Sequence, residues 1–291
     1  MFDTSKWHIP FMKYRRLALG ISCALMVLSL GLVIAKGLNL SVDYTGGILL
    51  QVEFPAAVEV GQVREALAGV GQGQATIQAY SDRGVIVRFQ SQSGENRKQV
   101  LGALGQRFGK IQVLRLETVG PVVGEELRQQ AFVALILALG GILAYMAFRF
   151  QFRFGMAAIF SLLHDVILML GVYSLTGKEV GVSFIAAILT VVGYSLNDSI
   201  VVLDRVRENW KELRGKGIVD LVDESVNQTL SRTINTSLTT LLPVLAMYFL
   251  GGEVISNFAF AFLVGITVGT YSSIYIASAV VAEWYLRSPK Y

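Results

Sequence analysis

Long runs of apolar residues, separated by short polar segments, dominate this chain. Three runs carry no charged residue, and each is long enough to cross a hydrocarbon core of about 30 Å; they are Leu17 to Ala35, Ala131 to Phe148 and Phe258 to Ala282. Three further runs are interrupted by polar side chains; they are Phe154 to Leu175, Val180 to Leu203 and Thr233 to Leu250. The pattern predicts a membrane α-helical protein with six transmembrane helices.

The segment between the first two spans has a different periodicity. Its short patterns are typical of strands at 47–54, 75–80, 85–89 and 112–119, and of helices at 59–70 and 95–108. The order β-α-β-β-α-β predicts a small α+β domain of the ferredoxin-like type, with one sheet face open. Such a face suits a polypeptide or a neighbouring domain, and a spacer that packs on a partner is an equal alternative.

Composition and charge place these segments relative to the membrane. The chain is 53% hydrophobic and 16% charged, with a mean hydropathy of +0.55, which excludes a soluble protein. Lys and Arg gather in the segments on one side, whereas the short loops of the other side hold only Lys178. The positive-inside rule therefore predicts cytoplasmic termini and a periplasmic domain. The basic residues form no single tract, so the net charge of +4 does not indicate nucleic-acid binding.

These patterns divide the chain into three parts. Residues 1–38 form the cytoplasmic N-terminus and first span, 39–130 the inserted domain, and 131–291 the other five spans, with a cytoplasmic loop at 204–232. Within that loop, apolar residues from Ile218 to Leu230 share one side, which predicts a short helix on the membrane surface.

The fourth span carries the first candidate for chemistry. Asn197 and Asp198 lie inside an otherwise apolar helix, where an aspartate costs roughly 2.5 to 3.5 kcal/mol near the centre. At helical spacing Asp198 falls on one face with Asn197 and with Thr190, Tyr194 and Val201. A polar stripe of this kind must face protein or water.

The fifth span offers a partner for that carboxylate. Arg232, Thr236, Thr239, Thr240 and Pro243 recur on one face. Antiparallel packing of the two helices would bring Arg232 to the level of Asp198. The two groups would attract when the aspartate is ionised and separate when it is protonated, which makes a two-state switch. A static ion pair that pins two helices is the alternative.

Polar and small residues on the third and sixth spans add weaker signals. His164 and Asp165 lie near the middle of the third span, about 100° apart on a helix. Asp165 is a candidate for extending a proton relay, and a helix-packing hydrogen bond is the favoured interpretation of His164. Gly265, Gly269 and Ser273 recur every four residues, a ridge that predicts close helix packing.

The sequence lacks the motifs of several enzyme classes. Each Gly-Lys pair lacks the upstream glycine of a phosphate-binding loop, so nucleotide hydrolysis is not the expected energy source. Two histidines and one cysteine make a metal site improbable. We expect no enzymatic activity, no metal and no cofactor other than protons.

Several motifs, taken together, resemble one known family. The stretch GYSLNDSIVVLDRVREN at 193–209, the stretch LLHDV at 162–166 and the sequence DYTGG at 43–47 occur in the order typical of the SecD/SecF protein-export subunits. The last of these contains the residues Asp43, Thr45, Gly46 and Gly47. This family is in turn similar to the resistance-nodulation-division transporters.

The resemblance implies a role in protein export across the bacterial cell inner membrane. It implies that proton flow drives late steps of preprotein translocation, with Asp198 and Arg232 in the proton path and Thr239 and Thr240 beside them. It also implies SecD as an obligate partner that supplies the other half of a pseudo-symmetric pair. Further implied partners are the SecY, SecE and SecG channel, the SecA motor, and YajC and YidC. A non-transducing scaffold and a small-molecule or metal efflux pump are the alternatives.

Overall fold

The computed structural model describes residues 8–89, 94–212, 215 and 217–288. The chain forms two compact units, one made of residues 1–39 and 134–291 and the other of residues 40–133. Each unit has its own hydrophobic core.

The first unit is helical. Within the described residues, six helical stretches are long and apolar enough to cross a membrane, as the hydropathy pattern predicted. The helices are α1 (Arg15–Lys36), α5 (Pro121–Arg149), α6 (Phe152–Thr176), α7 (Val182–Glu212), α8 (Ile218–Leu250), α9 (Gly252–Ser272) and α10 (Ser278–Arg287). The short elements are a 3-10 turn η1 (Phe11–Tyr14), a π-helical turn η2 (Ser273–Ala277) and the strands β1 (Asn39–Leu40) and β6 (Glu179–Val180).

The connection between the fourth and fifth spans differs from the prediction. Helix α7 continues to Glu212, and α8 begins at Ile218 and runs without interruption to Leu250. The separate surface helix predicted at 218–230 was therefore wrong, because these residues are the first turns of the spanning helix. Their apolar side, including Leu221 and Val226, is buried in the core of the unit.

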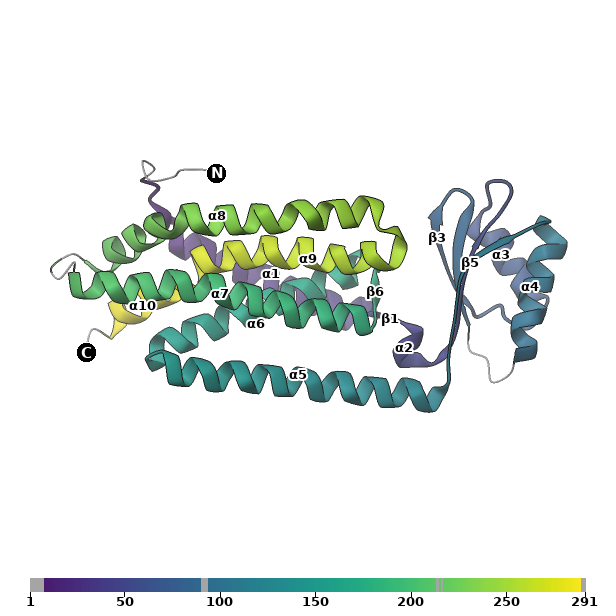
Figure 1. The fold of residues 1–291 in the computed structure, drawn as a ribbon, viewed down its shortest axis with the longest axis horizontal. Helices are drawn as coiled ribbons and strands as arrows, with labels where there is room; N and C mark the ends of the chain where they lie inside the picture. The colour runs from purple at the N-terminus through teal and green to yellow at the C-terminus, as the bar shows by residue number, and fades with distance from the viewer. Residues whose placement is uncertain (1–7, 90–93, 213–214, 216, 289–291) are drawn as a thin grey trace. The chain divides into compact units, whose positions relative to one another are not determined.

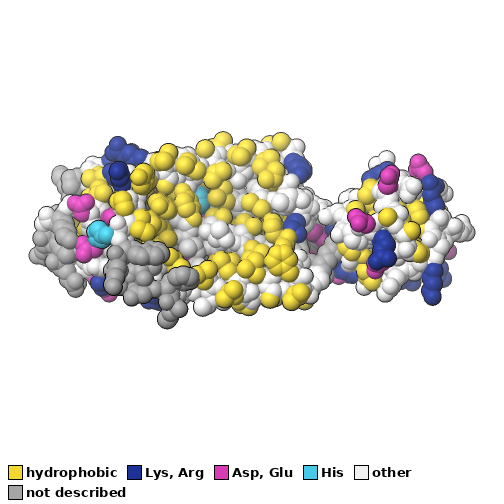
Figure 2. All heavy atoms as spheres, turned by 90° about the horizontal axis from the view of Figure 1, so that it is seen from above, with side chains coloured by type: hydrophobic (Ala, Val, Ile, Leu, Met, Phe, Trp, Pro, Cys, Tyr) yellow, Lys and Arg dark blue, Asp and Glu magenta, His cyan; other side chains and the backbone are white. Residues whose placement is uncertain are grey.

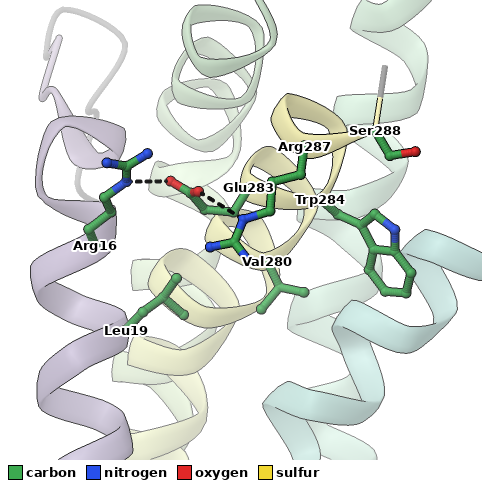
Figure 3. Close-up of a pocket in the computed structure, with 7 residues that line it drawn as sticks. All are labelled: Arg16, Leu19, Val280, Glu283, Trp284, Arg287 and Ser288. Carbon is green, nitrogen blue, oxygen red and sulfur yellow. Dashed lines mark hydrogen bonds and ion pairs between the residues drawn. The ribbon is translucent and has the colours of Figure 1, made fainter. Parts of the chain in front are cut away.

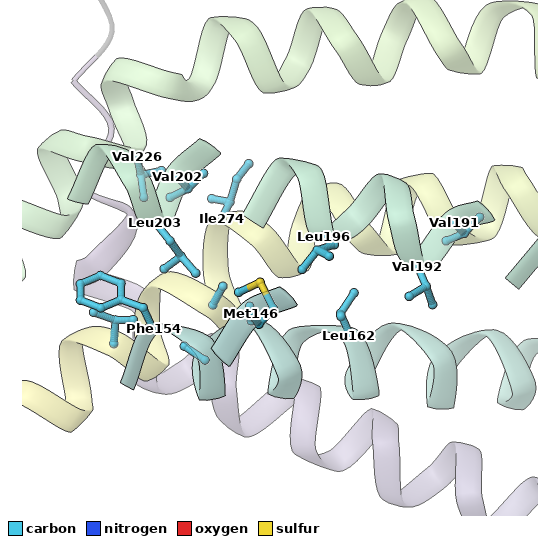
Figure 4. Packing of buried hydrophobic residues seen from close by; sticks show 14 of the residues in the cluster. Met146, Phe154, Leu162, Val191, Val192, Leu196, Val202, Leu203, Val226 and Ile274 are labelled. Atoms are coloured by element: carbon cyan, nitrogen blue, oxygen red, sulfur yellow. The ribbon is translucent and has the colours of Figure 1, made fainter. Parts of the chain in front are cut away.

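Packing in the helical unit brings α7, α8 and α9 side by side, and α1 against α6 (Figure 1). Figure 4 shows the interior, where Leu162 of α6 and Val191, Val192 and Leu196 of α7 meet. Hydrophobic side chains cover the middle of this unit on the face in Figure 2, and charged side chains lie toward its ends. This distribution suits a hydrocarbon environment.

The second unit is built on a four-stranded antiparallel sheet. Its elements are α2 (Val42–Thr45), β2 (Gly47–Glu53), α3 (Val60–Ala68), β3 (Thr76–Ser81), β4 (Gly84–Phe89), α4 (Gly94–Phe108) and β5 (Gln112–Val119). The strands lie in the order β3-β4-β2-β5, with Leu50 of β2 opposite Val87 on one side and Leu116 on the other. The predicted strands and helices are present, with boundaries shifted by one or two residues.

Both faces of this sheet bury apolar side chains. Val52 of β2 and Val87 of β4 pack with Leu67 of α3 and Leu104 of α4, which covers one face with the helices. On the opposite face, Leu49 and Ile86 are also fully buried and pack with Val42 and Val119. The prediction of one open face was therefore wrong for the centre of the sheet. Exposed apolar side chains of the sheet include Val113, Leu114 and Leu116 on the edge strand β5 and Tyr80 on β3.

Candidate functional site

The carboxyl group of Asp198 lies inside the helical unit. Asp198 is 3% exposed, and Ser195 and Ser199 beside it on α7 are fully buried. Asp198 Oδ2 is buried and has no hydrogen-bond partner among the described residues. Asn197, one residue earlier, is exposed, because neighbouring residues on a helix point about 100° apart. Asn197 and Asp198 therefore point to different sides of α7, although the sequence pattern had placed them on one face.

Arg232 lies on α8, the helix that packs beside α7. The side chain of Arg232 is on the exposed side of its helix, and Thr239 is exposed as well. The Thr239 hydroxyl donates to the backbone oxygens of Asn235 at 2.8 Å and Thr236 at 3.0 Å, within its own helix. The Thr240 hydroxyl donates to the Thr236 backbone oxygen at 2.9 Å and also lies 3.4 Å from the Tyr194 hydroxyl on α7. Of the two threonines, Thr240 is thus the one that links α7 and α8.

Asp165 on α6 is the centre of a second, fully buried polar cluster. Its Oδ2 accepts hydrogen bonds from the Ser195 hydroxyl of α7 at 2.5 Å and the Ser272 hydroxyl of α9 at 2.8 Å. His164 Nδ1 lies 2.9 Å from the other oxygen, Oδ1. The expectation that His164 and Asp165 point apart was wrong, because the two side chains fold toward each other. This cluster joins three helices through one carboxyl group.

Sequence reasoning missed Ser195 and Ser272. Both lie in apolar helices where serine is common, and neither stands out without its tertiary neighbours. Ser272 immediately precedes the π-helical turn, and the hydroxyl of Ser278, the residue after that turn, donates to the Ser273 backbone oxygen at 3.1 Å. Turns of this type often occur at functional sites. Asp165, which the sequence did identify, is the signal that could have led to both serines.

Close packing of α9 on α7 holds the two polar clusters near the middle of the unit. A Cβ atom added to Gly265 would lie 2.5 Å from Val191 Cγ1, and one added to Gly269 would lie 3.0 Å from Ser195 Cβ. The absence of side chains at these positions lets the helices approach. Ser273, the third residue of the ridge, is fully buried.

The DYTGG sequence forms a capped turn at the start of the second unit. The Ser41 hydroxyl accepts from the Asp43 backbone N–H at 3.1 Å and so caps the short helix α2. Gly46 and Gly47 have φ values of 68° and 119°, a region that side chains disfavour. The Thr45 hydroxyl donates to the Ser41 backbone oxygen at 3.1 Å, which closes the turn.

No group of three or more His, Cys, Asp or Glu side chains with metal-binding geometry occurs in the described part of the chain. The polar clusters thus consist of carboxylates, hydroxyls, one imidazole and one guanidinium. Carboxyl and imidazole groups can hold and transfer protons, whereas a guanidinium keeps its charge.

Two models of one protein family match this chain. Residues 100–287 match the model of the family described as "Protein export membrane protein SecD/SecF, C-terminal", and residues 31–55 match the "SecD/SecF GG Motif". The chain belongs to the SecD/SecF family. Asp165, Asp198 and Arg232 all fall within the first match, and the DYTGG turn falls within the second.

Relatives in the SecD/SecF family extend over nearly the whole chain. It is 45% identical over 289 residues to the protein translocase subunit SecF of Desulfurispirillum indicum, covering 96% of this chain and 92% of that one. It is 48% identical over 283 residues to the protein translocase subunit SecDF of Thermus thermophilus, covering 94% of this chain but 38% of the relative.

A solved structure shares the fold. The crystal structure of SecDF from Thermus, titled a translocon-associated membrane protein, matches with a TM-score of 0.92 and 46% identity, covering 99% of this chain and 40% of that one. Membership in the SecD/SecF family, together with six apolar helices, identifies a multi-pass membrane protein of the Sec export system.

Proposed function

We propose that this chain is a proton-driven subunit that acts with SecD to promote late steps of preprotein translocation. Asp198 carries the argument, because it is a buried carboxyl group on a spanning helix with one oxygen that lacks a hydrogen-bond partner among the described residues. A carboxyl group held in this way can gain or lose a proton without breaking a network at that oxygen. In this proposal the charge of Arg232, on the neighbouring helix α8, would favour the ionised form.

The membrane potential is large enough to drive such a step. One elementary charge that crosses the membrane releases about 2.3 kcal/mol per 100 mV. In this proposal the ionised carboxylate attracts Arg232, and protonation weakens that attraction. The change would shift α7 relative to α8, and Asp165 and its serines would hold α6, α7 and α9 together during the shift. The chain would need no hydrolytic site and no cofactor besides protons.

The partner in this proposal is SecD. The Thermus relative is named SecDF and is a longer chain, of which this one matches 38%. Polar groups on the outer surface of the spanning helices also favour a partner, since Asn197 and Arg232 are exposed and would be costly in contact with lipid. A second subunit, or water between the two, would cover them. The SecY, SecE and SecG channel, SecA, YajC and YidC belong to the same assembly in this proposal.

The same proposal includes an orientation and a domain assignment. Basic residues end the spans on one side, including Arg149 of α5, Arg153 of α6 and Arg287 of α10, which favours cytoplasmic termini in a bacterial inner membrane. The second unit would then be periplasmic. The strand order β3-β4-β2-β5, with two helices on one face, supports a ferredoxin-like fold for that unit.

The test is preprotein translocation driven by a proton gradient in inverted vesicles that contain this chain, SecD and the channel. The Asp198→Asn variant should assemble normally, as judged by co-purification with SecD, and should lose the gradient-dependent step. Asp204→Asn is the matched control, because Asp204 lies on the same helix but pairs with Arg149 at 2.6 Å near its end. We expect this control to keep its gradient dependence.

A different outcome would favour the scaffold alternative. If Asp198→Asn vesicles still translocate at a normal, gradient-dependent rate, then Asp198 is structural and the proton path lies elsewhere. If the variant fails to co-purify with SecD, the aspartate acts in assembly.

A further inference from the structure

A cavity outside the polar clusters lies between the start of α1 and the end of α10 (Figure 3). Its volume is about 590 Å³, within the range of small-molecule sites. The residues that line it are Arg16, Leu19, Val280, Glu283, Trp284, Arg287 and Ser288. The proposed function uses none of them.

The charge around this cavity is mainly positive. Glu283 is the one carboxylate among its lining residues, and its Oε1 accepts from Arg15 Nε and Arg16 Nε, each at 2.9 Å. Arg287 Nε lies 4.0 Å from the other oxygen, Oε2. The side chains of Arg16 and Arg287 are 77% and 84% exposed. Two arginines already satisfy the carboxylate, so the remaining guanidinium donors of Arg16 and Arg287 are available to an outside anion.

The cavity lies at the ends of two spanning helices, the level at which lipid headgroups are expected. Arg16 is in the first turn of α1 and Arg287 is the last residue of α10, so both lie at the ends of spanning segments. Trp284 lines the same cavity and packs edge-on against Phe152 with ring centres 6.0 Å apart. Arginine and tryptophan at the ends of spans are typical of the headgroup region. Leu19 and Val280 supply an apolar wall that an acyl chain could contact.

We infer that this cavity binds the phosphate of an anionic phospholipid, in the leaflet that contacts the basic ends of the spans. The phosphate would accept hydrogen bonds from the Arg16 and Arg287 guanidinium groups, and the first carbons of an acyl chain would lie along Leu19 and Val280. Basic pockets between spanning helices are suited to headgroups of this kind. The cavity should prefer an anionic headgroup over a zwitterionic one, because the local charge is positive and would repel the cationic group of a zwitterionic headgroup.

The test is native mass spectrometry of the delipidated full chain in detergent, with three added probes. They are dioleoyl phosphatidylglycerol, dioleoyl phosphatidylcholine and glycerol 3-phosphate. We expect retention of phosphatidylglycerol and much weaker retention of the other two. The double variant Arg16→Gln with Arg287→Gln should lower phosphatidylglycerol binding by about tenfold. The matched control, Arg205→Gln with Arg207→Gln, removes equal charge from the end of α7 and should bind as the parent does.

A second variant distinguishes lipid binding in the cavity from a general attraction of anionic lipid to positive charge. Val280→Trp fills the cavity while keeping both arginines, and it should also weaken phosphatidylglycerol binding. Size-exclusion profiles and circular dichroism identify any misfolded variant. If the double variant Arg16→Gln with Arg287→Gln misfolds, Arg287→Gln alone replaces it. Equal binding by the parent and the cavity variants would overturn the inference. Equal retention of phosphatidylcholine, or retention of glycerol 3-phosphate alone, would overturn the anionic-lipid assignment.

Discussion

At the scale of single residues, two buried carboxyl groups on adjoining helices have different surroundings. Asp165 Oδ2 accepts hydrogen bonds from serines on two other helices. Asp198 Oδ2, by contrast, has no such partner in the described ranges. Hydrogen bonds from two other helices tie the Asp165 carboxyl group into the packing, whereas an oxygen without a partner is not tied in this way. The different surroundings support a packing role for Asp165 and a titrating role for Asp198.

The packing role of Asp165 predicts a measurable loss of stability on removal of one donor. Ser195→Ala should lower the free energy of unfolding by about 1 to 2 kcal/mol, because a buried hydrogen bond to the Asp165 carboxyl group is lost. Ser199→Ala is the control, since the Ser199 hydroxyl is buried without a partner in the described part of the chain. It should be neutral or slightly stabilising. Thermal unfolding in detergent measures both, and equal melting temperatures for the two variants would contradict the packing role.

A second prediction at this scale concerns Tyr44 in the DYTGG turn. Burial raises the pKa of Tyr44 to about 12, and the neighbouring Asp43 carboxylate adds to the shift. The fold therefore favours the neutral phenol, and this contribution to stability is complete below pH 10 and is lost as the pH rises toward 12.

Tyr44→Phe removes the titrating hydroxyl and should make unfolding in urea less sensitive to pH between 10 and 12. At pH 7 the variant should be no less stable, because the Tyr44 hydroxyl is buried and unpartnered among the described residues. Tyr80→Phe, at a side chain that is 37% exposed, is the matched control. A parallel pH dependence in the parent and Tyr44→Phe would contradict this account.

At the scale of elements, the approach of α9 to α7 positions both polar clusters. This approach depends on the glycines of α9, since Gly265 faces Val191 and Gly269 faces Ser195. The π-helical turn after Ser272 changes the direction in which the following side chains of this helix point, compared with a regular α-helix. Together they bring a serine of α9 to the carboxyl group of α6.

Two alanine substitutions test this contact. Gly265→Ala should destabilise the protein by about 1 to 3 kcal/mol, because the new methyl group would lie 2.5 Å from Val191 Cγ1. Gly193→Ala on α7 makes the same chemical change where nothing lies within 4 Å, and it should stabilise by up to about 1 kcal/mol through helix propensity. Melting temperatures in detergent distinguish the two. Stabilisation by both substitutions would show that the contact is loose.

At the scale of the whole molecule, the charge asymmetry predicts which segments face the cytoplasm. The chain has one cysteine, Cys23, so a Cys23→Ala background permits labelling of single introduced cysteines. In intact spheroplasts, a membrane-impermeant maleimide should label Asp82→Cys in the second unit. It should label Glu208→Cys, near the end of α7, only after lysis. The opposite pattern would reverse the proposed orientation.

Much of this architecture could be predicted from the sequence, because it depends on local patterns. The six apolar runs, the strands of the second unit and the intramembrane Asp198 and Asp165 follow from periodicity and from the cost of burying charge.

The hydrogen-bond partners of these carboxyl groups could not be predicted from the sequence. Ser195 and Ser272 are 77 residues apart and meet at Asp165 only because three helices pack together. The burial of Asp198 rather than Asn197, the continuity of α8 and the buried second face of the sheet were also decided by packing. Which side chains become buried depends on contacts between distant segments, and a local pattern contains no information about those contacts.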